Sequence, residues 1–533
     1  MSNKITEKIR KKNLDLTKKL IKIGKSLSLE NDIKKVFKII LDEVMEVTFA
    51  DRGVIYITAN DQKYLQYERV KSLSDGIEMD AKAAKLQWKS IDLFEDSGEP
   101  VMNSLATFVF HTGFEAHFDD VYSQDFFQID QIIAIDQRDH YRSKSMVAVP
   151  LVDHEDRVLG IIELTNSISE EGDIIPFSEE HIDILLSVSS QAAITLSNKL
   201  LITSLEKMIF DFTQAIAYAI DMKSDKTYQH VQKVAILTNI LAKEVNKADV
   251  GIYSLQKFSQ DELDEIALSG WLHDLGKIAT SNNLLNKNTK LLSSCDRISF
   301  IGIKFELLEQ VIINKLHQEP GLAEKADLER ILNLLPDYLG LVSSINQGSE
   351  YVSEEIINKL QEIAAVKVEA SGKEYRLLDE DELENLMIKR GTLTSKEYTE
   401  IKKHASLTYK MLANISFPTK FKNLPKIASS HHERMNGSGY PLGLKEEEIP
   451  LQSRILAIAD VFDALMSKRS YKSPYNLEKS LKILAVMAKD NELDKDLMDI
   501  LLDKQIYLTF ASEYEAKDHS IIDISKIKEI YRS

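Results

Sequence analysis

The sequence has little of what extracellular, fibrous and membrane-spanning proteins need. Its 533 residues include one cysteine, Cys295, so no internal disulfide can form, and a reducing compartment is expected. With 10 prolines and 19 glycines, it lacks the composition of collagen-like or disordered chains. No run approaches the ~18 apolar residues of a membrane-spanning helix, and the basic N-terminus lacks the apolar core of a signal peptide. We therefore expect a cytoplasmic protein without a membrane partner.

The chain also lacks an excess of positive charge. It has 67 Lys and Arg against 84 Asp and Glu, a net charge of −17. Nucleic acids and anionic membranes are bound mainly through basic residues, so we expect no nucleic-acid polymer as a partner. The 44% hydrophobic and 28% charged residues are typical of a folded protein, and a chain of this length allows about three or four domains.

The first half of the chain combines helical and alternating patterns. Residues 1–27 predict a charged N-terminal helix, and residues 32–46 predict an amphipathic one, since their apolar residues recur at spacings of three and four. A long helix is expected from about Ser178. Period-two alternation predicts three strands, of which the last two form a hairpin: 53–58, 146–152 and 158–166.

The long helix carries a narrow seam of mostly apolar residues. It follows the alternating spacing of four and three that is typical of paired helices: Ile194, Asn198, Leu201, Leu205, Met208, Phe212, Ala215 and Ala219. This pattern favours a homodimer through the connecting helix, residues 185–225, with Asn198 fixing the register. A single helix that packs on its own domains fits equally well, and both interpretations stay open.

From residue 203 onward the patterns are mostly helical. The exception is 366–378, where two alternating runs flank Ser371 and Gly372 and predict a β-hairpin. Five histidines in this half lie within strong helical patterns: His230, His273, His404, His431 and His432. The other seven show no ligand-like spacing and are expected to be ordinary surface or packing residues: His111, His117, His140, His154, His181, His317 and His519.

Two carboxylates join the five histidines as candidate metal ligands. Asp274 directly follows His273, and Asp460 lies in a helical pattern. Imidazole with carboxylate suits iron, manganese or zinc rather than calcium or magnesium. Seven ligands exceed the need of one ion and fit two divalent metals that share a carboxylate, a centre that can activate water and clamp a phosphate. On a helix, Lys277 would share the face of His273 and Asp274 and reach that phosphate. A single histidine in a helical pattern would more often be an ordinary core residue than a metal ligand.

Two segments, WLHDLGK (271–277) and HHERMNGSGYP (431–441), closely resemble the motifs of the HD-GYP family. Its members are metal-dependent phosphodiesterases that act on cyclic di-GMP. The resemblance covers roughly 203–290 and 391–480, and it implies an all-α domain over residues 203–516. The intervening residues, about 291–390, look like an added helical subdomain of unknown role.

The resemblance implies a role for each of the seven ligands. The first metal would be held by His230, His273, Asp274 and Asp460. Asp274 would bridge to the second metal, which is completed by His404, His431 and His432. The ions would be iron or manganese. Lys277 and Asp274 would act in catalysis.

The same resemblance assigns residues around the metals. The GYP loop would line the substrate through Gly437, Gly439, Tyr440 and Pro441. Arg469 and Lys472 would face a substrate phosphate, although an exposed basic helix end explains them as well. Glu433 is expected to orient a ligand histidine, and Asp463 is expected to make a structural hydrogen bond.

The sequence departs from the family pattern at three positions. Asn436 replaces the usual Asp, but Asn also suits a turn, so the loop should keep its shape. Ser470 replaces a common Pro. Lys226 stands where some members have a Glu that binds a third metal, and its charge would repel a cation. We therefore expect two metals rather than three.

Residues 28–197 resemble a GAF domain, an α+β sensor fold with an antiparallel sheet and flanking helices. The resemblance is carried by FADRGVIYI (49–57), FDDVYS (118–123), YRSKSMVAVPLV (141–152) and LGIIELTN (159–166). Asn166 and Phe177 match the signature of cyclic-nucleotide-binding members, whereas Ser167, His181 and Ile182 replace its other residues. An unknown small-molecule ligand and a ligand-free dimerisation module both remain open.

These observations predict a multidomain protein in which a GAF sensor is joined by a long helix to an all-α HD-GYP domain with a helical insert and a small β-hairpin. The predicted function is hydrolysis of cyclic di-GMP to linear pGpG, with GMP as a further possible product, under control of the GAF domain. One alternative is another substrate such as cyclic GMP-AMP. The other is a non-catalytic receptor or scaffold for the dinucleotide or for a GGDEF-type synthase, but such scaffolds usually lack metal ligands.

Overall fold

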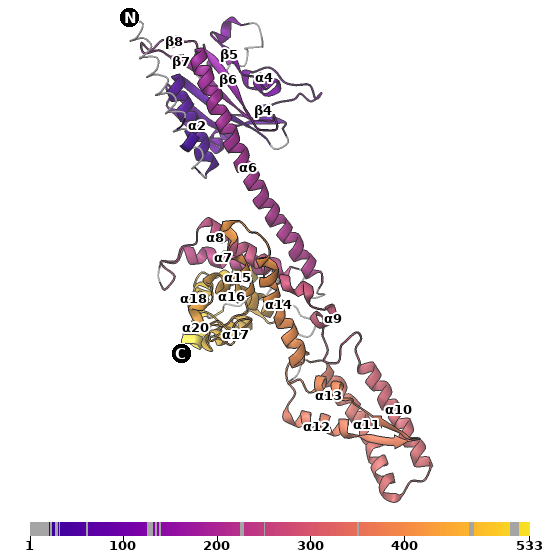
Figure 1. Cartoon of the computed structure of the whole chain (residues 1–533). Coiled ribbons are helices and arrows are strands. Elements are labelled where there is room, and N and C mark those ends of the chain that lie inside the picture. The colour runs from indigo at the N-terminus through magenta and orange to yellow at the C-terminus, as the bar shows by residue number, and fades with distance from the viewer. Residues whose placement is uncertain are drawn as a thin grey trace. The chain divides into compact units, whose positions relative to one another are not determined.

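The computed structural model describes residues 21, 24–26, 30, 32–59, 62–124, 132–133, 136–137, 140–223, 229–249, 251–348, 351–467, 474–511 and 522–532. The chain divides into two compact units, residues 1–208 and 209–533 (Figure 1). The helix expected over residues 1–27 falls almost entirely outside the described residues and stays a prediction. Within the described ranges, no helix has the length and apolar character needed to cross a bilayer.

An antiparallel sheet forms the centre of the first unit. Its strand order is β3-β2-β1-β7-β6-β5, with β4 paired to β2 and β8 paired to β7. The three expected strands are confirmed as β1, β6 and β7, and β6 and β7 pair as the expected hairpin. The strands are β1 (Ala50–Thr58), β2 (Tyr64–Ser72), β3 (Ile77–Asp80), β4 (Ile91–Asp92), β5 (Ala116–Phe118), β6 (Met146–Val152), β7 (Val158–Ile168) and β8 (Ile174–Ile175).

Alternation along the strands gives each face of this sheet its own core. Ile55 and Ile162 point to one face, which α2 and the first half of α6 cover; the two helices lie side by side in Figure 1. Val54 and Ile161 point to the other face, with α3 and α4. The helices of this unit are α2 (Ile33–Thr48), α3 (Ala81–Gln87), α4 (Leu105–Thr112), the 3₁₀ turn η1 (Val121–Ser123) and α6 (Glu179–Asp221), which continues into the second unit.

Helices build the core of the second unit. α7, α16, α17, α18 and α20 share one hydrophobic core, and α8 and α15 share another with the last turns of α6. Their bounds are α7 (His230–Asn246), α8 (Gln260–Leu272), η2 (Leu275–Ala279), α9 (Asn282–Leu285), α14 (Ser395–Ala413), η3 (Thr419–Phe421), α15 (Leu424–Ser429), η4 (Glu446–Glu448), α16 (Leu451–Met466), α17 (Leu477–Lys489), α18 (Lys495–Asp503), α19 (Ile506–Ala511) and α20 (Ile524–Arg532).

The residues between Leu291 and Leu386 form a hydrophobic core of their own. Helices α10 and α11 pack together, and the expected hairpin is confirmed as β9 and β10, with Ser371 and Gly372 at the turn. The elements are α10 (Ile298–His317), α11 (Leu322–Asn346), α12 (Glu354–Ala365), β9 (Lys367–Ala370), β10 (Lys373–Arg376) and α13 (Glu380–Leu386).

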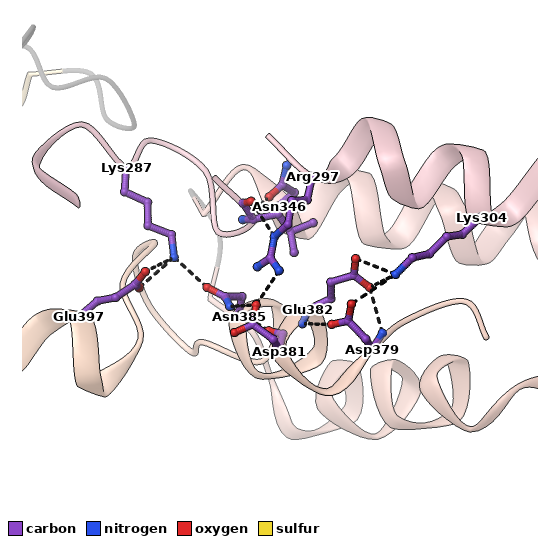
Figure 2. A network of polar contacts seen from close by, with 10 residues as sticks. Lys287, Arg297, Lys304, Asn346, Asp379, Asp381, Glu382, Asn385 and Glu397 are labelled. Carbon is purple, nitrogen blue, oxygen red and sulfur yellow. Dashed lines mark hydrogen bonds and ion pairs between the residues drawn. The ribbon is translucent and has the colours of Figure 1, made fainter. Parts of the chain in front are cut away.

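A buried lysine joins this inserted subdomain to helix α14 (Figure 2). Nζ of Lys287 lies 2.7 Å from Oδ1 of Asn385 in α13 and 2.8 Å from both carboxylate oxygens of Glu397 in α14. Glu397 also accepts a hydrogen bond from the backbone N–H of Thr394, which caps α14. A buried charge is tolerated only when it is paired and hydrogen-bonded, and Lys287 meets both conditions. These contacts of Lys287 therefore hold α13 of the subdomain next to α14.

Candidate metal centre

Helix α7 begins with a buried histidine whose two ring nitrogens have different partners. Nδ1 of His230 lies 2.6 Å from Oδ2 of Asp463 in α16. Nε2 points the other way, 3.5 Å from Oδ1 of Asp460 and 3.6 Å from Oδ2 of Asp274. The Asp463 contact holds the proton on Nδ1 and leaves Nε2 as the ligand atom. Asp463 thus makes a hydrogen bond of the kind that the sequence predicted.

The His-Asp motif lies in a turn rather than within a continuous helix. Helix α8 ends at Leu272, and the 3₁₀ turn η2 begins at Leu275. The ring of His273 is fixed by a 2.8 Å contact between its Nδ1 and the carbonyl oxygen of Gly270. In a 3₁₀ turn, residues i and i+3 lie on the same side, so Lys277 still reaches Asp274 and contacts its Oδ2. Lys277 therefore lies next to Asp274 as expected, but through a 3₁₀ turn and not through an α-helix.

A second group of histidines comes from α14 and from the segment after α15. Nδ1 of His404 lies 2.7 Å from the carbonyl oxygen of Ile401, and Nδ1 of His431 lies 2.7 Å from that of Ala428. His431 and the adjacent His432 follow the end of α15, so they occupy a turn and not the helix that their pattern indicated. The rings of His404 and His432 lie 5.0 Å apart, between centroids.

Asp274 lies between the two groups. Its Oδ2 is 3.3 Å from Nε2 of His273 and 3.6 Å from Nε2 of His230, whereas its Oδ1 is 3.5 Å from Nε2 of His404. Two atoms that each bind one ion at ~2.1 Å, at an angle near 90–110°, lie about 3.0–3.4 Å apart. The carboxylate therefore offers one oxygen to each group, at separations close to those of ligands that share an ion.

Several atoms that point into the centre make no hydrogen bond within the described part of the chain. Among the described residues, four buried atoms of this site have no hydrogen bond: Nε2 of His273, Oδ1 of Asp274, Nε2 of His404 and Nε2 of His431. Buried polar atoms are rarely left unsatisfied. Two clusters have ligand atoms close enough to hold a metal ion: His230 with His273 and Asp274, and His404 with His431 and His432. The residues present therefore fit divalent metal ions that prefer nitrogen and oxygen ligands.

A glycine brings the two groups together. A Cβ atom on Gly276 would lie 2.0 Å from the carbonyl oxygen of His404, so only glycine allows η2 to approach α14 this closely. The N–H of Gly276 donates to Oγ1 of Thr408, at 2.8 Å, and that hydroxyl donates to the carbonyl oxygen of His273, at 3.1 Å. This contact sets the distance between Asp274 and His404.

The electrostatics of the two groups differ. Burial lowers the pKa of His230, but its hydrogen bonds with Asp274 and Asp463 outweigh burial and raise that pKa to about 10. Burial lowers the pKa of His431 to about 3 and also lowers the pKa values of His404 and His432. In the metal-free chain, the surroundings of His230 therefore favour its charged form, whereas those of the second group favour neutral imidazoles.

The expected GYP loop is held at the rim by tight backbone turns. Gly437 has a φ of 79°, which favours glycine, and a Cβ on Gly439 would lie 2.3 Å from the backbone N of Arg434. Glu433 closes the loop, since its oxygens accept the N–H groups of Leu442 at 2.7 Å and Leu444 at 2.9 Å. This differs from the expected role of Glu433, because its carboxylate is occupied by the loop and not by a ligand histidine.

Tyr440 is the residue of the loop that faces the histidines. Its ring lies 4.6 Å from that of His432, between centroids, and its peptide bond to Pro441 is cis. Asn436 accepts hydrogen bonds from the N–H of Ser438 at 2.9 Å and from its hydroxyl at 2.6 Å, so Asn keeps a turn at the position where the family usually has Asp. The expected substrate contacts Arg469 and Lys472, together with Ser470 and Lys226, lie outside the described residues.

Three further residues near the centre were missed by the sequence analysis. The last turn of α6 places Oδ2 of Asp221 3.4 Å from the N–H of Val231, next to His230. Lys223 follows, and its Nζ donates to the carbonyl oxygens of Lys277, Ile278 and Thr280. On α14, Nζ of Lys402 lies 5.2 Å from the ring centre of Tyr440. No motif in the sequence marks these contacts.

Comparison with protein families gives each unit a match. Residues 32–196 match the GAF domain model, and residues 381–497 match the HD domain model. The chain carries a GAF domain followed by an HD domain. The HD match contains His404, His431, His432 and Asp460, whereas His230 and His273 precede it in the sequence. The fold class that the sequence predicted is thereby confirmed.

Curated proteins that resemble part of this chain have cyclic dinucleotides in their names. A "probable cyclic di-GMP phosphodiesterase" of Vibrio cholerae is 35% identical over 147 residues, which are 26% of this chain and 33% of the relative. A "cyclic di-GMP phosphodiesterase" of Thermotoga maritima is 41% identical over 99 residues, 19% of this chain and 27% of the relative. A "3'3'-cGAMP-specific phosphodiesterase 1" of Vibrio cholerae is 28% identical over 248 residues, which are 44% of this chain and 54% of the relative. The alignments thus span about a third, a quarter and a half of these relatives.

Proposed function

We propose that this chain is a metal-dependent phosphodiesterase that hydrolyses cyclic di-GMP to linear pGpG. The observation that carries the proposal is the place of Asp274 between two histidine groups, with one carboxylate oxygen toward each. The names of the relatives support the substrate class. Lys277 beside Asp274 supplies the positive charge that a phosphodiester substrate needs.

In this proposal, two ions of iron or manganese occupy the centre. The first is held by His230, His273, Asp274 and Asp460. The second is held by Asp274, His404, His431 and His432. When bound, such a metal pair polarises the phosphoryl oxygens and lowers the pKa of a bound water. Carbonyl contacts to Nδ1 hold the rings of His273, His404 and His431 for this task.

The chain's own residues position and neutralise the substrate. Lys277 stabilises the negative charge that develops on the departing 3′-oxygen and donates a proton to it. Tyr440, in the loop that also contains Gly437, Gly439 and Pro441, borders the substrate beside His432. Lys402 lies near the Tyr440 ring and adds a cation at this rim. Arg469 and Lys472 complete the proposed phosphate contacts.

The choice between cyclic dinucleotides stays part of the proposal. The relatives include proteins named for cyclic di-GMP and others named for 3′3′-cGAMP. We propose cyclic di-GMP, with cyclic GMP-AMP as the second candidate. Turnover of both substrates by the same metal-loaded sample decides between them, and a higher kcat/KM for cyclic GMP-AMP would reverse the assignment.

Two variants test whether the centre is catalytic. His273→Ala and Asp274→Ala should each lose bound metal and cyclic di-GMP turnover together. His317→Ala is the matched control, because His317 is an exposed histidine in α10, and it should keep both. Unchanged turnover in either of the first two variants would refute the proposed site. Dinucleotide binding without turnover in the wild-type chain would favour the receptor alternative.

We further propose a homodimer through α6 and control of the HD domain by the GAF domain. All eight seam residues are exposed in the structure, including large side chains such as Phe212 at 66% and Met208 at 60%. An uncovered apolar stripe of this kind fits pairing with a second copy better than packing within one chain. A GGDEF-type synthase as partner and a cytoplasmic location, in keeping with the single exposed cysteine, belong to the same proposal.

A further inference from the structure

A carboxylate stands in the middle of the central GAF strand, where its nearest neighbours on the two adjacent strands are apolar. Glu163 lies in β7 between β1 and β6, opposite Val54 on one side and Ala148 on the other. Both neighbours belong to the hydrophobic core on this face of the sheet. A charged residue at such a position destabilises the fold unless something pairs with it.

Glu163 is weakly paired among the described residues. In the described part of the chain, its one hydrogen bond is with the hydroxyl of Tyr56, at the long distance of 3.5 Å. Burial raises the pKa of Glu163 to about 7, and the weak bond from Tyr56 opposes this only slightly. The surroundings of the side chain therefore disfavour its charged form.

Two neighbouring charged residues, Asp136 and Arg52, have close hydrogen-bond or ion-pair partners. Asp136 accepts hydrogen bonds from the hydroxyl of Tyr122 at 2.9 Å and from the N–H and hydroxyl of Ser143, both at 2.8 Å. Arg52 is paired with Asp75 at 2.7 Å. No hydrogen bond or ion pair joins either group to Glu163 among the described residues, and the side chain of Glu163 lines a cavity.

That space is a cavity of about 1390 Å³. Three aromatic residues line it beside Glu163 and form what we term the aromatic wall: Tyr56, Tyr67 and Trp88. Ring centroids are 5.0 Å apart between Tyr56 and Tyr67 and 5.4 Å apart between Tyr67 and Trp88. Among the other lining residues, acids outnumber lysines: Asp92, Glu95 and Asp96 against Lys63 and Lys89.

We propose that the GAF domain binds a small organic cation in this cavity, with Glu163 as its counter-ion and the aromatic wall against its apolar part. Aromatic faces attract cations, and a carboxylate with one weak hydrogen bond in an apolar environment is stabilised by a positive charge. An anionic ligand would meet the repulsion of Glu163. The proposal rests on unit 1 alone and does not depend on the activity proposed for the HD domain.

Binding can be measured on the full-length chain through Trp88. The chain has two tryptophans, so Trp271→Phe leaves Trp88 as the only indole. The probes are choline and phenethylammonium, compared with their neutral isosteres 3,3-dimethyl-1-butanol and 2-phenylethanol. We expect saturable fluorescence changes with each cation and a Kd at least tenfold lower than for its isostere. Equal affinities, or no saturable response to either cation, would overturn the proposal.

Two variants test whether Glu163 causes the tighter binding of cations than of their neutral isosteres. Glu163→Gln keeps the size and removes the charge, and it should abolish the difference between cation and isostere. Glu170→Gln removes the same charge from an exposed position just after β7 and should leave the difference intact. Choline should raise the Tm of wild-type GAF unfolding but not that of Glu163→Gln, with sodium chloride as the ionic-strength control. The same rise in both proteins would contradict the inference.

Discussion

Oδ2 of Asp463 lies 2.6 Å from Nδ1 of His230, and both residues are buried. The two are 233 positions apart in the sequence, and the contact joins helix α16 to the first residue of α7. It keeps the proton on Nδ1 and makes Nε2 a better metal ligand, since a carboxylate partner raises the basicity of the imidazole. Asp463 therefore tunes the proposed metal centre without entering it.

Replacement of Asp463 by Asn should weaken the first metal. The amide keeps a hydrogen-bond acceptor but loses the charge, so we expect the metal Kd to rise by roughly 10- to 100-fold. Competition with a chelating dye measures this affinity. Turnover should recover when metal is saturating. Glu309→Gln, at an exposed position of α10, is the control; an unchanged Kd for Asp463→Asn would show that the contact has no effect on the metal.

Gly276→Ala should separate the two metal groups. The added Cβ would meet the carbonyl oxygen of His404 at 2.0 Å, so η2 and α14 must move apart and Asp274 can no longer serve both groups. We expect loss of at least one metal per chain and a fall in kcat of about 100-fold or more. Gly340→Ala in α11 is the matched control, because its Cβ would meet nothing within 4 Å. Full metal content and activity in Gly276→Ala would contradict this account of the packing.

The sequence predicted the elements whose signals are local. Strands β6 and β7 alternate along their own length, and the His-Asp and GYP segments are contiguous motifs. Contacts between distant segments carried no such signal. Lys287 pairs with Glu397 across 110 positions, and the environment of Glu163 depends on strands and aromatic residues from elsewhere in the domain. Glu433 was misjudged because its motif position does not reveal that Leu442 and Leu444 bind its carboxylate.

Acid should destabilise the HD domain of the metal-free chain. The folded pKa of His431, about 3, lies below the ~6.5 of an unfolded histidine, so protonation favours the unfolded state as the pH falls from ~6.5 toward 3. His404 and His432 act in the same direction. His230 does not oppose this loss, because a raised pKa contributes stability that is already complete below ~6.5. Asp221, whose pKa burial raises to about 6, opposes it, as do Glu265 and Asp496, whose pKa values burial also raises.

Urea unfolding of the chelator-treated chain tests this effect at pH 7 and pH 5. Trp271 reports on the HD domain in a Trp88→Phe background. We expect a lower midpoint at pH 5, and a smaller difference between the two pH values in His431→Gln. Equal midpoints in the parent chain would mean that these histidines are not buried in their neutral form.

Lys223→Met should lower catalysis without removing metal. Lys223 ties the end of α6 to the carbonyl oxygens of Lys277, Ile278 and Thr280, so its loss frees the turn that positions Lys277. We expect kcat to fall about tenfold with metal content and KM nearly unchanged. Lys243→Met, at an exposed position of α7, is the control and should behave like the wild type. An unaltered kcat for Lys223→Met would show that Lys223 does not position Lys277.

Charge in the seam of α6 should break the proposed dimer. Leu201→Glu together with Met208→Glu places carboxylates at two exposed apolar positions, where two copies of the helix would repel each other. Light scattering after size exclusion should give a dimer mass for the wild type and a monomer mass for the double variant. Lys207→Glu, an exposed position outside the seam, should remain dimeric. A monomeric wild type would refute the pairing.

The central claim is that Asp274 and its histidines hold two metals that hydrolyse cyclic di-GMP. Its most direct test is metal content per chain, measured on protein purified without oxygen, together with cyclic di-GMP turnover on the same sample. The account predicts about two iron or manganese ions per chain and formation of pGpG or GMP. Absence of metal, or two metals without turnover after reloading with iron or manganese, would contradict it.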